Sequence, residues 1–388
     1  MCRFFTFPGN YAIVSQIIYP GGITLKQATE STQSTRPGKT VLKILGRILF
    51  LIAETVLLAA IALYGVMFVL AKGPSPSLRD IFVMSVRETS AVGFLANLYL
   101  SDEEIAAIEA QEDAEEYIEI DTSLIQRPTT PPDQEDIPSD GPVADAWGLI
   151  DEDGDGIIVE PVKGEGYSGY MMVVLDPSRV IMGCVPNSFG GTGYTVAKMV
   201  SKFDAVAGIN AGGFVDIDGS GDGSTPDSLV VYKGKIYCAE NGTRDGFVGI
   251  DSQNILHVGK LSISEIRARD IQYGVCFGPA LVINGQLNKA SVLASGVNPR
   301  TAIGQRSDGA ILMLVIDGRQ IVSLGATFQD LAEIFLEYGA VNACNLDGGS
   351  STLMWYQGDY INNCASVVGI RPVPTTFLVL KEGADENG

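Results

Sequence analysis

The sequence predicts an α+β protein, in which a β-rich domain with a mixed sheet and few helices follows a transmembrane helix and a helical stalk. Three observations lead to this fold class: a 24-residue apolar run, an acidic stretch with crowded prolines, and then many short apolar runs between Gly, Asp and Asn turns. The expected segments are a cytoplasmic N-terminal part (1–47), the anchor (48–71), the stalk (73–118), an acidic Pro-rich linker (119–144) and the folded domain (145–388).

The apolar run at 48–71, ILFLIAETVLLAAIALYGVMFVLA, is interrupted only by Glu54. As a helix it extends over roughly 36 Å, which is enough to cross a bilayer with some tilt. A buried core helix is shorter, and a cleaved signal peptide would lie nearer the N-terminus and end at a small-x-small site. Basic residues precede the run and a net acidic region follows it, so the positive-inside rule predicts a cytoplasmic N-terminus and an extracellular C-terminal domain. The sequence therefore predicts a single-pass anchor in the cell membrane.

Helical spacing follows the anchor. Ser77 with Asp80, and Ser101 with Glu104, match the capping box that begins a helix. Residues 101–140 then hold 14 acidic residues and one basic residue. Such a stretch buries too little apolar surface to offset its ordering entropy, so a mobile spacer is expected there.

The folded domain is expected to consist mostly of short strands. Lys-Gly and Asn-Gly pairs at the centres of two runs predict hairpins. The clearest helix is 328–339, which Thr327 and Asp330 begin and Gly339 ends. The predicted strands are 169–176, 179–185, 228–239, 247–251, 254–261, 280–287, 311–319 and 375–381.

Composition excludes several classes of function. The net charge is -20, and 19 basic residues face 44 acidic residues after Lys72, so a nucleic-acid-binding surface is excluded. His257 is the only histidine and stands in a strand-like run, which disfavours histidine-driven nucleophiles and histidine-rich zinc sites. The cysteines show no CxxC spacing, and buried free thiols are expected, with a disulfide between two of them as the alternative. Those after the anchor are Cys184, Cys238, Cys276, Cys344 and Cys364.

An acidic, glycine-rich loop, GINAGGFVDIDGSGDGSTPD, follows the end of a core strand. Gly212 and Gly213 let backbone amides approach a ligand closely, and Asn210 and Asp216 bracket them. Asn210 and Asp216 stand next to the apolar strand and fit a binding site and a turn equally. Residues 218–227 are expected to form a solvated loop.

Two arginines flank the strand that ends at Asp317. Arg300 precedes it in NPRTAIGQ, and Arg319 follows it in VIDGRQ. A guanidinium group offers a planar fork of donors that suits phosphate or carboxylate oxygens. For either arginine alone, a surface salt bridge to one of the many acids is the alternative. We expect both to lie beside the loop DGGSST.

The strongest signal is NLDGGSST at 345–352. Gly348 and Gly349 permit a tight curl whose N–H groups can form an anion-binding nest, and Asp347 supplies a carboxylate at a strand end. A P-loop would need a Lys-Ser/Thr pair, and a nucleophile elbow would need G-x-S-x-G, and both are absent. The alternative is a turn capped by Asn345 and Asp347. The hydroxyl donors that follow are Ser350, Ser351 and Thr352.

No metal site follows from the sequence, although Ca²⁺ or Mg²⁺ binding stays open. Three aspartates and a glycine in DEDGDGIIVE (151–160) match the first half of a calcium loop, but Val162 stands where the pattern needs a bidentate Glu. A solvated acidic turn is therefore expected. Acid pairs such as Asp216 with Asp218 are the other candidates for a divalent cation.

Taken in order, the segments GINAGGFVD, NPRTAIGQ, VIDGRQ and NLDGGSST resemble the phosphodiester glycosidase family. The family includes an enzyme that removes N-acetylglucosamine from a sugar phosphodiester, and bacterial proteins labelled exopolysaccharide-related. The resemblance covers about residues 160–380 and is carried by the set of motifs. Family members often show three glycines after the aspartate, whereas here Gly349 is followed by Ser350.

The resemblance implies a catalytic domain that hydrolyses the bond between an anomeric carbon and a phosphodiester oxygen. Asp347 is then the first candidate for the catalytic carboxylate and Asp216 the second. Arg300, Arg319 and the glycine amides would meet charge on phosphate, while an asparagine and a serine, Asn210 and Ser351, would orient the substrate.

The implied substrate is a sugar phosphodiester or another anionic glycan of the cell envelope or of exopolysaccharide. Two alternatives stay open: a non-catalytic envelope module that binds anionic glycopolymer, and a phosphodiesterase that cleaves the P–O bond.

Overall fold

The structure is a computed structural model that describes residues 12–18, 24–30, 37–89, 92–109, 118–126, 144–216, 222–238, 246–292, 295–366 and 369–384. By its internal contacts the chain divides into two units, Met1–Met67 and Phe68–Gly388.

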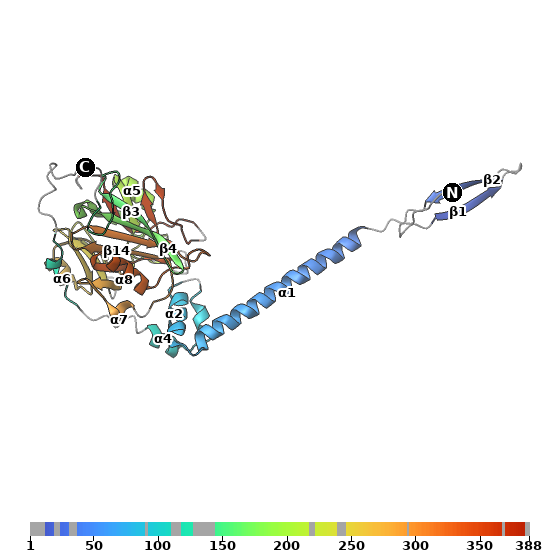
Figure 1. The fold of residues 1–388 in the computed structure, drawn as a ribbon, viewed down its shortest axis with the longest axis horizontal. Helices are drawn as coiled ribbons and strands as arrows, with labels where there is room; N and C mark the ends of the chain where they lie inside the picture. The colour runs from blue at the N-terminus through green and yellow to red at the C-terminus, as the bar shows by residue number, and fades with distance from the viewer. Residues whose placement is uncertain are drawn as a thin grey trace. The chain divides into compact units, whose positions relative to one another are not determined.

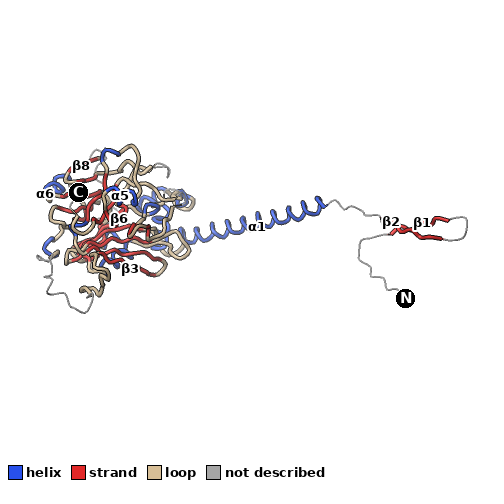
Figure 2. Tube along the Cα trace, turned by 90° about the horizontal axis from the view of Figure 1, so that it is seen from above, coloured by secondary structure: helices blue, strands red, loops and turns tan. Residues whose placement is uncertain are grey.

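The first unit holds a hairpin and most of a long helix. Strands β1 (Ala12–Ile18) and β2 (Thr24–Glu30) pair antiparallel, and α1 spans Pro37–Lys72. Figure 2 shows α1 as one continuous helix. Its part Val41–Lys72 is long and apolar enough to cross a membrane, judged by length and composition. The predicted anchor lies inside this range.

The second unit begins with a helical cluster: α2 (Pro76–Arg87), α3 (Phe94–Asn97) and α4 (Asp102–Glu109). The predicted capping box of Ser101 and Glu104 is present, since each side chain accepts a hydrogen bond from the other residue's backbone N–H. The start predicted at Ser77 is wrong. The N-cap is Ser75, because Pro76 has a fixed φ that suits the first helical position.

Three β-sheets form the body of the second unit (Figure 1). Their strand orders are β13-β12-β16-β14-β15-β4-β3, β18-β17-β6-β19-β5 and β10-β9-β11-β7-β8. Every pairing between the described strands is antiparallel, so the prediction of a mixed sheet is wrong for these strands, because sequence patterns within single strands do not show the direction of the partner strand. The strands are β3 (Ile157–Gly164), β4 (Tyr167–Val174), β5 (Val180–Cys184), β6 (Ala205–Asn210), β7 (Val230–Tyr232), β8 (Lys235–Tyr237), β9 (Phe247–Asp251), β10 (Leu256–Gly259), β11 (Ile271–Val275), β12 (Ala280–Ile283), β13 (Gln286–Leu287), β14 (Arg300–Arg306), β15 (Ile311–Ile316), β16 (Ala340–Leu346), β17 (Met354–Tyr356), β18 (Asp359–Tyr360) and β19 (Thr375–Leu380).

Few helices accompany these sheets, and each predicted strand run overlaps a strand, so the α+β fold class is confirmed. The predicted helix is α8, whose capping box joins Thr327 and Asp330. The described helices that follow the helical cluster are α5 (Val196–Lys202), α6 (Ile263–Ala268), α7 (Lys289–Val292) and α8 (Phe328–Glu337). Short 3-10 turns lie at η1 (Thr122–Leu124), η2 (Pro177–Arg179), η3 (Pro186–Ser188) and η6 (Gly349–Ser351).

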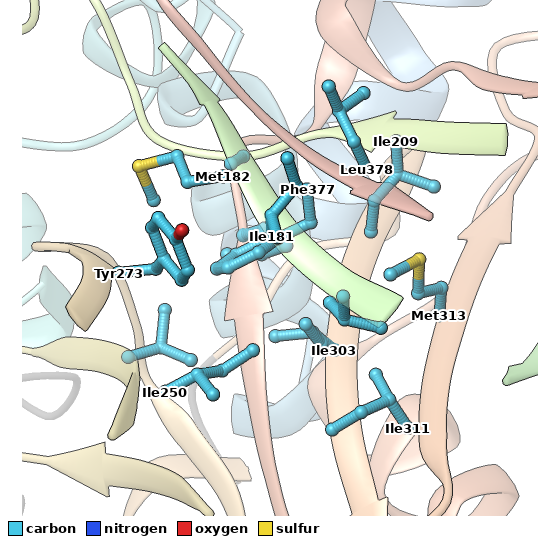
Figure 3. Packing of buried hydrophobic residues seen from close by; sticks show 14 of the residues in the cluster. Ile181, Met182, Ile209, Ile250, Tyr273, Ile303, Ile311, Met313, Phe377 and Leu378 are labelled. Carbon is cyan, nitrogen blue, oxygen red and sulfur yellow. The ribbon is translucent and has the colours of Figure 1, made fainter. Parts of the chain in front are cut away.

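The main core is shared by all three sheets. Figure 3 shows Ile209 of β6, Phe377 of β19, Ile250 of β9, Ile303 of β14 and Met313 of β15 packed within it. A second core fills the opposite face of the seven-stranded sheet, where α8 packs. Side chains alternate along a strand, so successive residues of β14 enter different cores. This alternation decides which way the residues at the start of β14 point.

Part of the expected spacer is packed on the folded body. Ile120 is buried in the main core, and the backbone N–H of Gln126 donates to Ser307 O over 2.7 Å. Residues 127–143 of the predicted linker, and Cys2, lie outside the described residues.

Candidate active site

The candidate site lies where the central strands of the largest sheet meet. The register of β14 places Arg300 opposite Ile316, the last residue of β15, and Thr301 opposite Leu346, the last residue of β16. The loops that follow β15 and β16 therefore leave the sheet at the edge where β14 begins. These are the loops that carry VIDGRQ and NLDGGSST, so the structure brings the predicted motifs together.

Asn210 connects this edge to the end of β6 in the neighbouring sheet. Its side chain is fully buried: Nδ2 donates to Asp347 O over 2.5 Å, and Oδ1 accepts from Thr301 Oγ1 at 2.8 Å and from Leu353 N at 3.1 Å. The backbone N–H of Asp347 donates to Ala211 O over 2.9 Å. Both polar atoms of the Asn210 side chain, Nδ2 and Oδ1, are thus bonded within the protein, which fits a positioning role better than contact with a substrate.

The glycine pair forms a tight curl. Gly349 has φ of 58°, in the left-handed region that favours glycine, and a Cβ on Gly348 would lie 2.6 Å from Pro299 O. However, the backbone N–H of Gly349 donates to Pro299 O over 2.9 Å, and those of Ser351 and Thr352 donate within the turn. The predicted anion nest is therefore wrong for Gly349, because its amide is occupied by the protein. Ser351 and Thr352 are both buried.

Arg319 is the predicted arginine that lies beside this curl. A Cβ on Gly349 would lie 3.5 Å from Arg319 Nη2, and the same nitrogen donates to Thr89 Oγ1 over 2.8 Å and to Asn298 Oδ1 over 3.2 Å. Burial lowers the pKa of Arg319, and the charge of nearby Arg300 lowers it further. The backbone of Arg319 has φ of 58°, a conformation that residues with a side chain rarely adopt.

Arg300 reaches the loop with its backbone but uses its guanidinium elsewhere. Nη2 forms an ion pair with Glu88 at 2.8 Å and donates to Gly296 O over 2.6 Å, Nε donates to Ala326 O over 3.1 Å, and the group lies 4.2 Å from the Phe328 ring centroid. The alternation of β14 explains this, because it turns Arg300 to the α8 face of the sheet. Of the two arginine side chains expected at the glycine curl, Arg319 lies there and Arg300 does not.

Arg371 is the site residue that the sequence motifs did not include. Its Nη1 pairs with Asp216 Oδ2 at 2.8 Å and donates to Ser350 Oγ over 3.3 Å, and its guanidinium lies 4.9 Å from the Phe214 ring centroid. The hydrogen bond that Arg371 donates to Asp216 is the main cause that raises the pKa of Arg371, and the charge of Asp347 adds to it. The only sequence signal was an arginine just before the polar start of a buried strand, in GIRPVPTTF.

The glycines of the other loop permit close packing. Gly212 donates its backbone N–H to Thr375 Oγ1 over 3.0 Å. A Cβ on Gly213 would lie 2.6 Å from Asp227 Oδ2, so only glycine leaves room for that carboxylate. Asp227 also accepts a hydrogen bond from Ser228 Oγ at 2.9 Å. The sequence predicted a solvated loop for Asp227, and the structure holds it against the backbone of the site.

Asp317 directly follows β15 and Asn345 lies near the end of β16, and both side chains are buried and form hydrogen bonds. Asp317 accepts three hydrogen bonds, from Asn362 Nδ2 at 3.1 Å and from Asn363 N and Nδ2 at 2.9 and 2.8 Å. Asn345 Nδ2 donates to a backbone carbonyl over 2.8 Å. Within the described part of the chain, Asn345 Oδ1 and Thr352 Oγ1 have no hydrogen-bond partner.

The acidic loop after the linker gathers Asp151, Asp153 and Asp155 with carboxylate oxygens within 4.8 Å of one another. Burial raises the pKa of Asp155, as do the two neighbouring carboxylates. This cluster is separate from the candidate site and is the metal-ligand group found among the described residues. Asp218, the other residue considered for a cation, lies outside them.

His257 and the cysteines take no part in the site. His257 is buried and its Nε2 lies 2.9 Å from Asp251 Oδ2, in agreement with the structural role expected for it. The five cysteines after the anchor are all free thiols, three of them buried, as the sequence predicted. A cavity of about 440 Å³ lies elsewhere, between α5, β5 and the β7–β8 hairpin, and Tyr232 and Tyr237 line it.

Comparison with known proteins adds a family to this geometry. The model of the phosphodiester glycosidase family matches residues 203–380. The chain is 42% identical over 81 residues to an SPbeta prophage-derived uncharacterized protein of Bacillus subtilis, which is 21% of this chain and 13% of that protein. It is 25% identical over 226 residues to mouse N-acetylglucosamine-1-phosphodiester alpha-N-acetylglucosaminidase, which is 52% of this chain and 42% of the mouse enzyme.

Among solved structures, the catalytic domain of the zebrafish enzyme of the same name aligns with a TM-score of 0.48 and 20% identity, over 58% of this chain and 82% of that one. The chain thus spans less than half the length of the two curated relatives. Residues 203–380 contain every predicted site residue, from Asn210 to Thr352, and also Arg371. The resemblance to the phosphodiester glycosidase family that the motifs indicated is therefore supported over residues 203–380.

Proposed function

We propose that this protein is a membrane-anchored hydrolase that cleaves the bond between the anomeric carbon of a sugar and a phosphodiester oxygen. One observation carries the proposal: Arg371 is held by Asp216 and Ser350 at the junction of two sheets, within electrostatic range of the carboxylate of Asp347. A fixed cation next to carboxylates suits a substrate with a negative phosphate and a sugar that becomes positive during cleavage.

Arg371 is the residue assigned to the phosphate. Its raised pKa keeps it charged at any physiological pH, and its planar donors match phosphate oxygens. In the described structure Asp216 accepts from the same guanidinium, so it orients Arg371 until a phosphate arrives. Arg319, which lies beside the glycine curl at Gly349, supplies the second positive charge.

Asp347 is the carboxylate assigned to the sugar. Its backbone is fixed at both ends of the peptide, by Ala211 O and by Asn210 Nδ2, so its position does not depend on a mobile loop. A phosphomonoester is a good leaving group, and little proton donation to it is needed. The carboxylate then stabilises the oxocarbenium-like sugar or activates the attacking water.

Arg300 and Asn210 have supporting roles in this scheme. Arg300 is ion-paired with Glu88 on the α8 face, and Asn210 is enclosed between the two sheets. Both hold the backbone on which the reacting groups stand.

The location follows from the anchor. Helix α1 contains a stretch apolar enough to cross a membrane, and its preceding basic residues favour a cytoplasmic N-terminus. The domain then lies outside the cell membrane, where envelope glycans and exopolysaccharides carry sugar phosphodiesters.

The test is turnover of a chromogenic sugar-1-phosphodiester by the full-length protein in detergent. Asp347→Asn is expected to lower kcat about 10²–10⁴-fold, because a catalytic carboxylate contributes on that scale. Asp204→Asn is the matched control, since its 84% exposed side chain pairs with Lys381 at the surface. Wild-type turnover by Asp347→Asn, or binding of anionic glycopolymer with no turnover by the wild type, would reject the assignment.

Oxygen-18 water separates the two possible bonds. Label in the released sugar is expected for cleavage at the anomeric carbon, whereas label in the phosphate would mean a phosphodiesterase. The same assay with EDTA, and with added Ca²⁺ or Mg²⁺, determines whether a divalent cation takes part.

A further inference from the structure

The end of α1 is packed against the helical cluster that follows it. Phe68 lies one turn before the end of α1, and its ring centroid is 6.4 Å from that of Tyr99. Lys72 Nζ pairs with Glu104 Oε1 at 3.0 Å, and Tyr99 also packs edge-on against Phe82 of α2, with centroids 6.3 Å apart. Phe68 and Lys72 belong to the stretch that is apolar enough to cross a membrane. Side chains packed on them therefore lie at the depth of the bilayer surface when that stretch spans it.

Large apolar side chains of the same cluster are exposed. Leu78 of α2, Phe94 of α3 and Leu98 just after α3 are the three, and all are more than half exposed. We refer to them as the collar. An aromatic and two leucines next to the end of a membrane-spanning stretch are typical of residues that contact lipid.

A second exposed apolar group stands on the loop between β15 and α8. Ile321 is 102% exposed, Val322 is 78% exposed and Leu324 is 61% exposed. The turn is rigid, because Gln320 N donates to Ser323 O over 2.9 Å and Ser323 N donates to Gln320 O over 3.2 Å. We refer to residues 320–325 as the tip. No residue of the tip is charged, although the molecule as a whole has a charge of -20.

The tip is attached to both the helical cluster and the candidate site. Arg319, directly before it, donates to Thr89 Oγ1 over 2.8 Å, and Thr89 comes two residues after the end of α2. The same arginine lies against the glycine curl at Gly349. Helix α2 has 12 residues and therefore rises about 18 Å from its start, four residues after Lys72. Thr89, which Arg319 contacts, is thus 17 residues along the chain from Lys72, the last residue of the apolar stretch.

We propose that the tip inserts into the outer surface of the bilayer that α1 spans, with the collar resting on the same surface. This inference rests on the membrane anchoring in the proposed function. Exposed aliphatic side chains on a rigid, uncharged turn gain free energy by leaving water, and the acidic surface around them gives no such gain. The lipid surface is the partner because the same chain carries a stretch apolar enough to span a bilayer. Insertion places Arg319, which lies against the glycine curl, at the headgroup layer, where a lipid-linked sugar phosphodiester would be presented.

Tryptophan placed at the tip measures its contact with lipid. The full-length Ile321→Trp protein is reconstituted into vesicles of phosphatidylcholine and phosphatidylglycerol, with or without bromine on the acyl chains, and its fluorescence is compared with that of wild type. Phe94→Trp reports the collar. Leu175→Trp is the matched control, because Leu175 is a partly exposed apolar residue at the far end of β4 from Gly166, whose carbonyl accepts from Leu324 N at 2.8 Å. The length of β4 separates this control from the tip by about 27 Å.

Brominated lipid is expected to quench the added tryptophan at 321 and at 94 at least twofold and to leave that at 175 unchanged. Equal quenching of the tryptophans at 321 and 175 would overturn the proposal. Quenching at 321 that disappears when each vesicle holds one protein would overturn it as well, since the tip would then contact a second copy of the protein. The measurement uses no substrate. A quenched but catalytically inactive protein would therefore reject the proposed hydrolysis and keep the membrane contact, and an unquenched active protein would do the reverse.

Discussion

Replacing Asn210 with alanine removes three buried hydrogen bonds at once, because Nδ2 serves Asp347 O and Oδ1 serves Thr301 Oγ1 and Leu353 N. Each bond contributes about 1 kcal/mol net, and a buried group left without a partner costs about 1–3 kcal/mol. Asn210→Ala is therefore expected to lower the free energy of unfolding by about 3–5 kcal/mol, a large part of the 5–15 kcal/mol typical of folded domains.

The assay is thermal unfolding of the full-length protein in detergent, followed by tryptophan fluorescence. For a domain of this size, each kcal/mol lowers Tm by about 2–4 °C, so a fall of at least 6 °C is expected. Below the new transition, kcat for a sugar phosphodiester is expected to fall as well, because the peptide that carries Asp347 loses a support. Native Tm with unchanged kcat would refute the role of Asn210 as the connection between the sheets.

Thr301→Val tests the hydrogen bond to Asn210 separately from the packing of the side chain. It keeps the volume of the side chain and removes only the donor to Asn210 Oδ1, which retains the N–H of Leu353. The expected loss is about 1 kcal/mol. In the double variant the effect of Thr301→Val is expected to vanish, because its partner is already absent. Full additivity would contradict the hydrogen-bond account.

Three further changes test other parts of the structure. Burial alone would raise the pKa of Asp145, but hydrogen bonds from Arg306 and from two backbone amides lower it. The ionised carboxylate therefore stabilises the fold above about pH 4, and this contribution is lost as the pH falls through the lowered pKa of the folded state. Asp145→Asn is therefore expected to destabilise by about 2 kcal/mol at pH 7, with a difference in Tm that narrows below about pH 4. Burial raises the pKa of the Cys184 thiol to about 12, so iodoacetamide at pH 7.5 is expected to leave this thiol unmodified in the folded protein and to modify it after unfolding. Peptide mass spectrometry measures the modification, and rapid labelling of the folded protein would contradict the prediction. Gly348→Ala would set a Cβ 2.6 Å from the backbone oxygen of Pro299, so the curl has to shift, and both Tm and kcat are expected to fall, kcat by at least about tenfold. Unchanged turnover would mean that the curl does not carry the reacting groups.

Much of the fold could be predicted because its signals are local. The run FVGID coincides with β9, and the capping box of Thr327 and Asp330 begins α8 as expected, since both depend on residues within a few positions of each other. The hairpin of β1 and β2 was not predicted, because its residues show no strict alternation. The domain limits stay a prediction.

The candidate site could be predicted in part for the same reason. Asp347 and the glycine curl were recognisable from NLDGGSST alone. Arg371 was missed because it becomes a site residue only through Asp216, 155 positions away, and no pattern within its own segment indicates that pair.

Residue order along the chain was sufficient to indicate an apolar helix, a β-rich domain and a carboxylate-bearing glycine loop, because periodicity, capping and turn chemistry act between near neighbours. Which guanidinium groups reach that loop depended on strand register and on the face of β14 that each side chain takes: Thr301 turns to Asn210 while the adjacent Arg300 turns to Glu88. A shift of one residue would exchange those faces, and that choice is made by the packing of one sheet against another and of α8 against the opposite side.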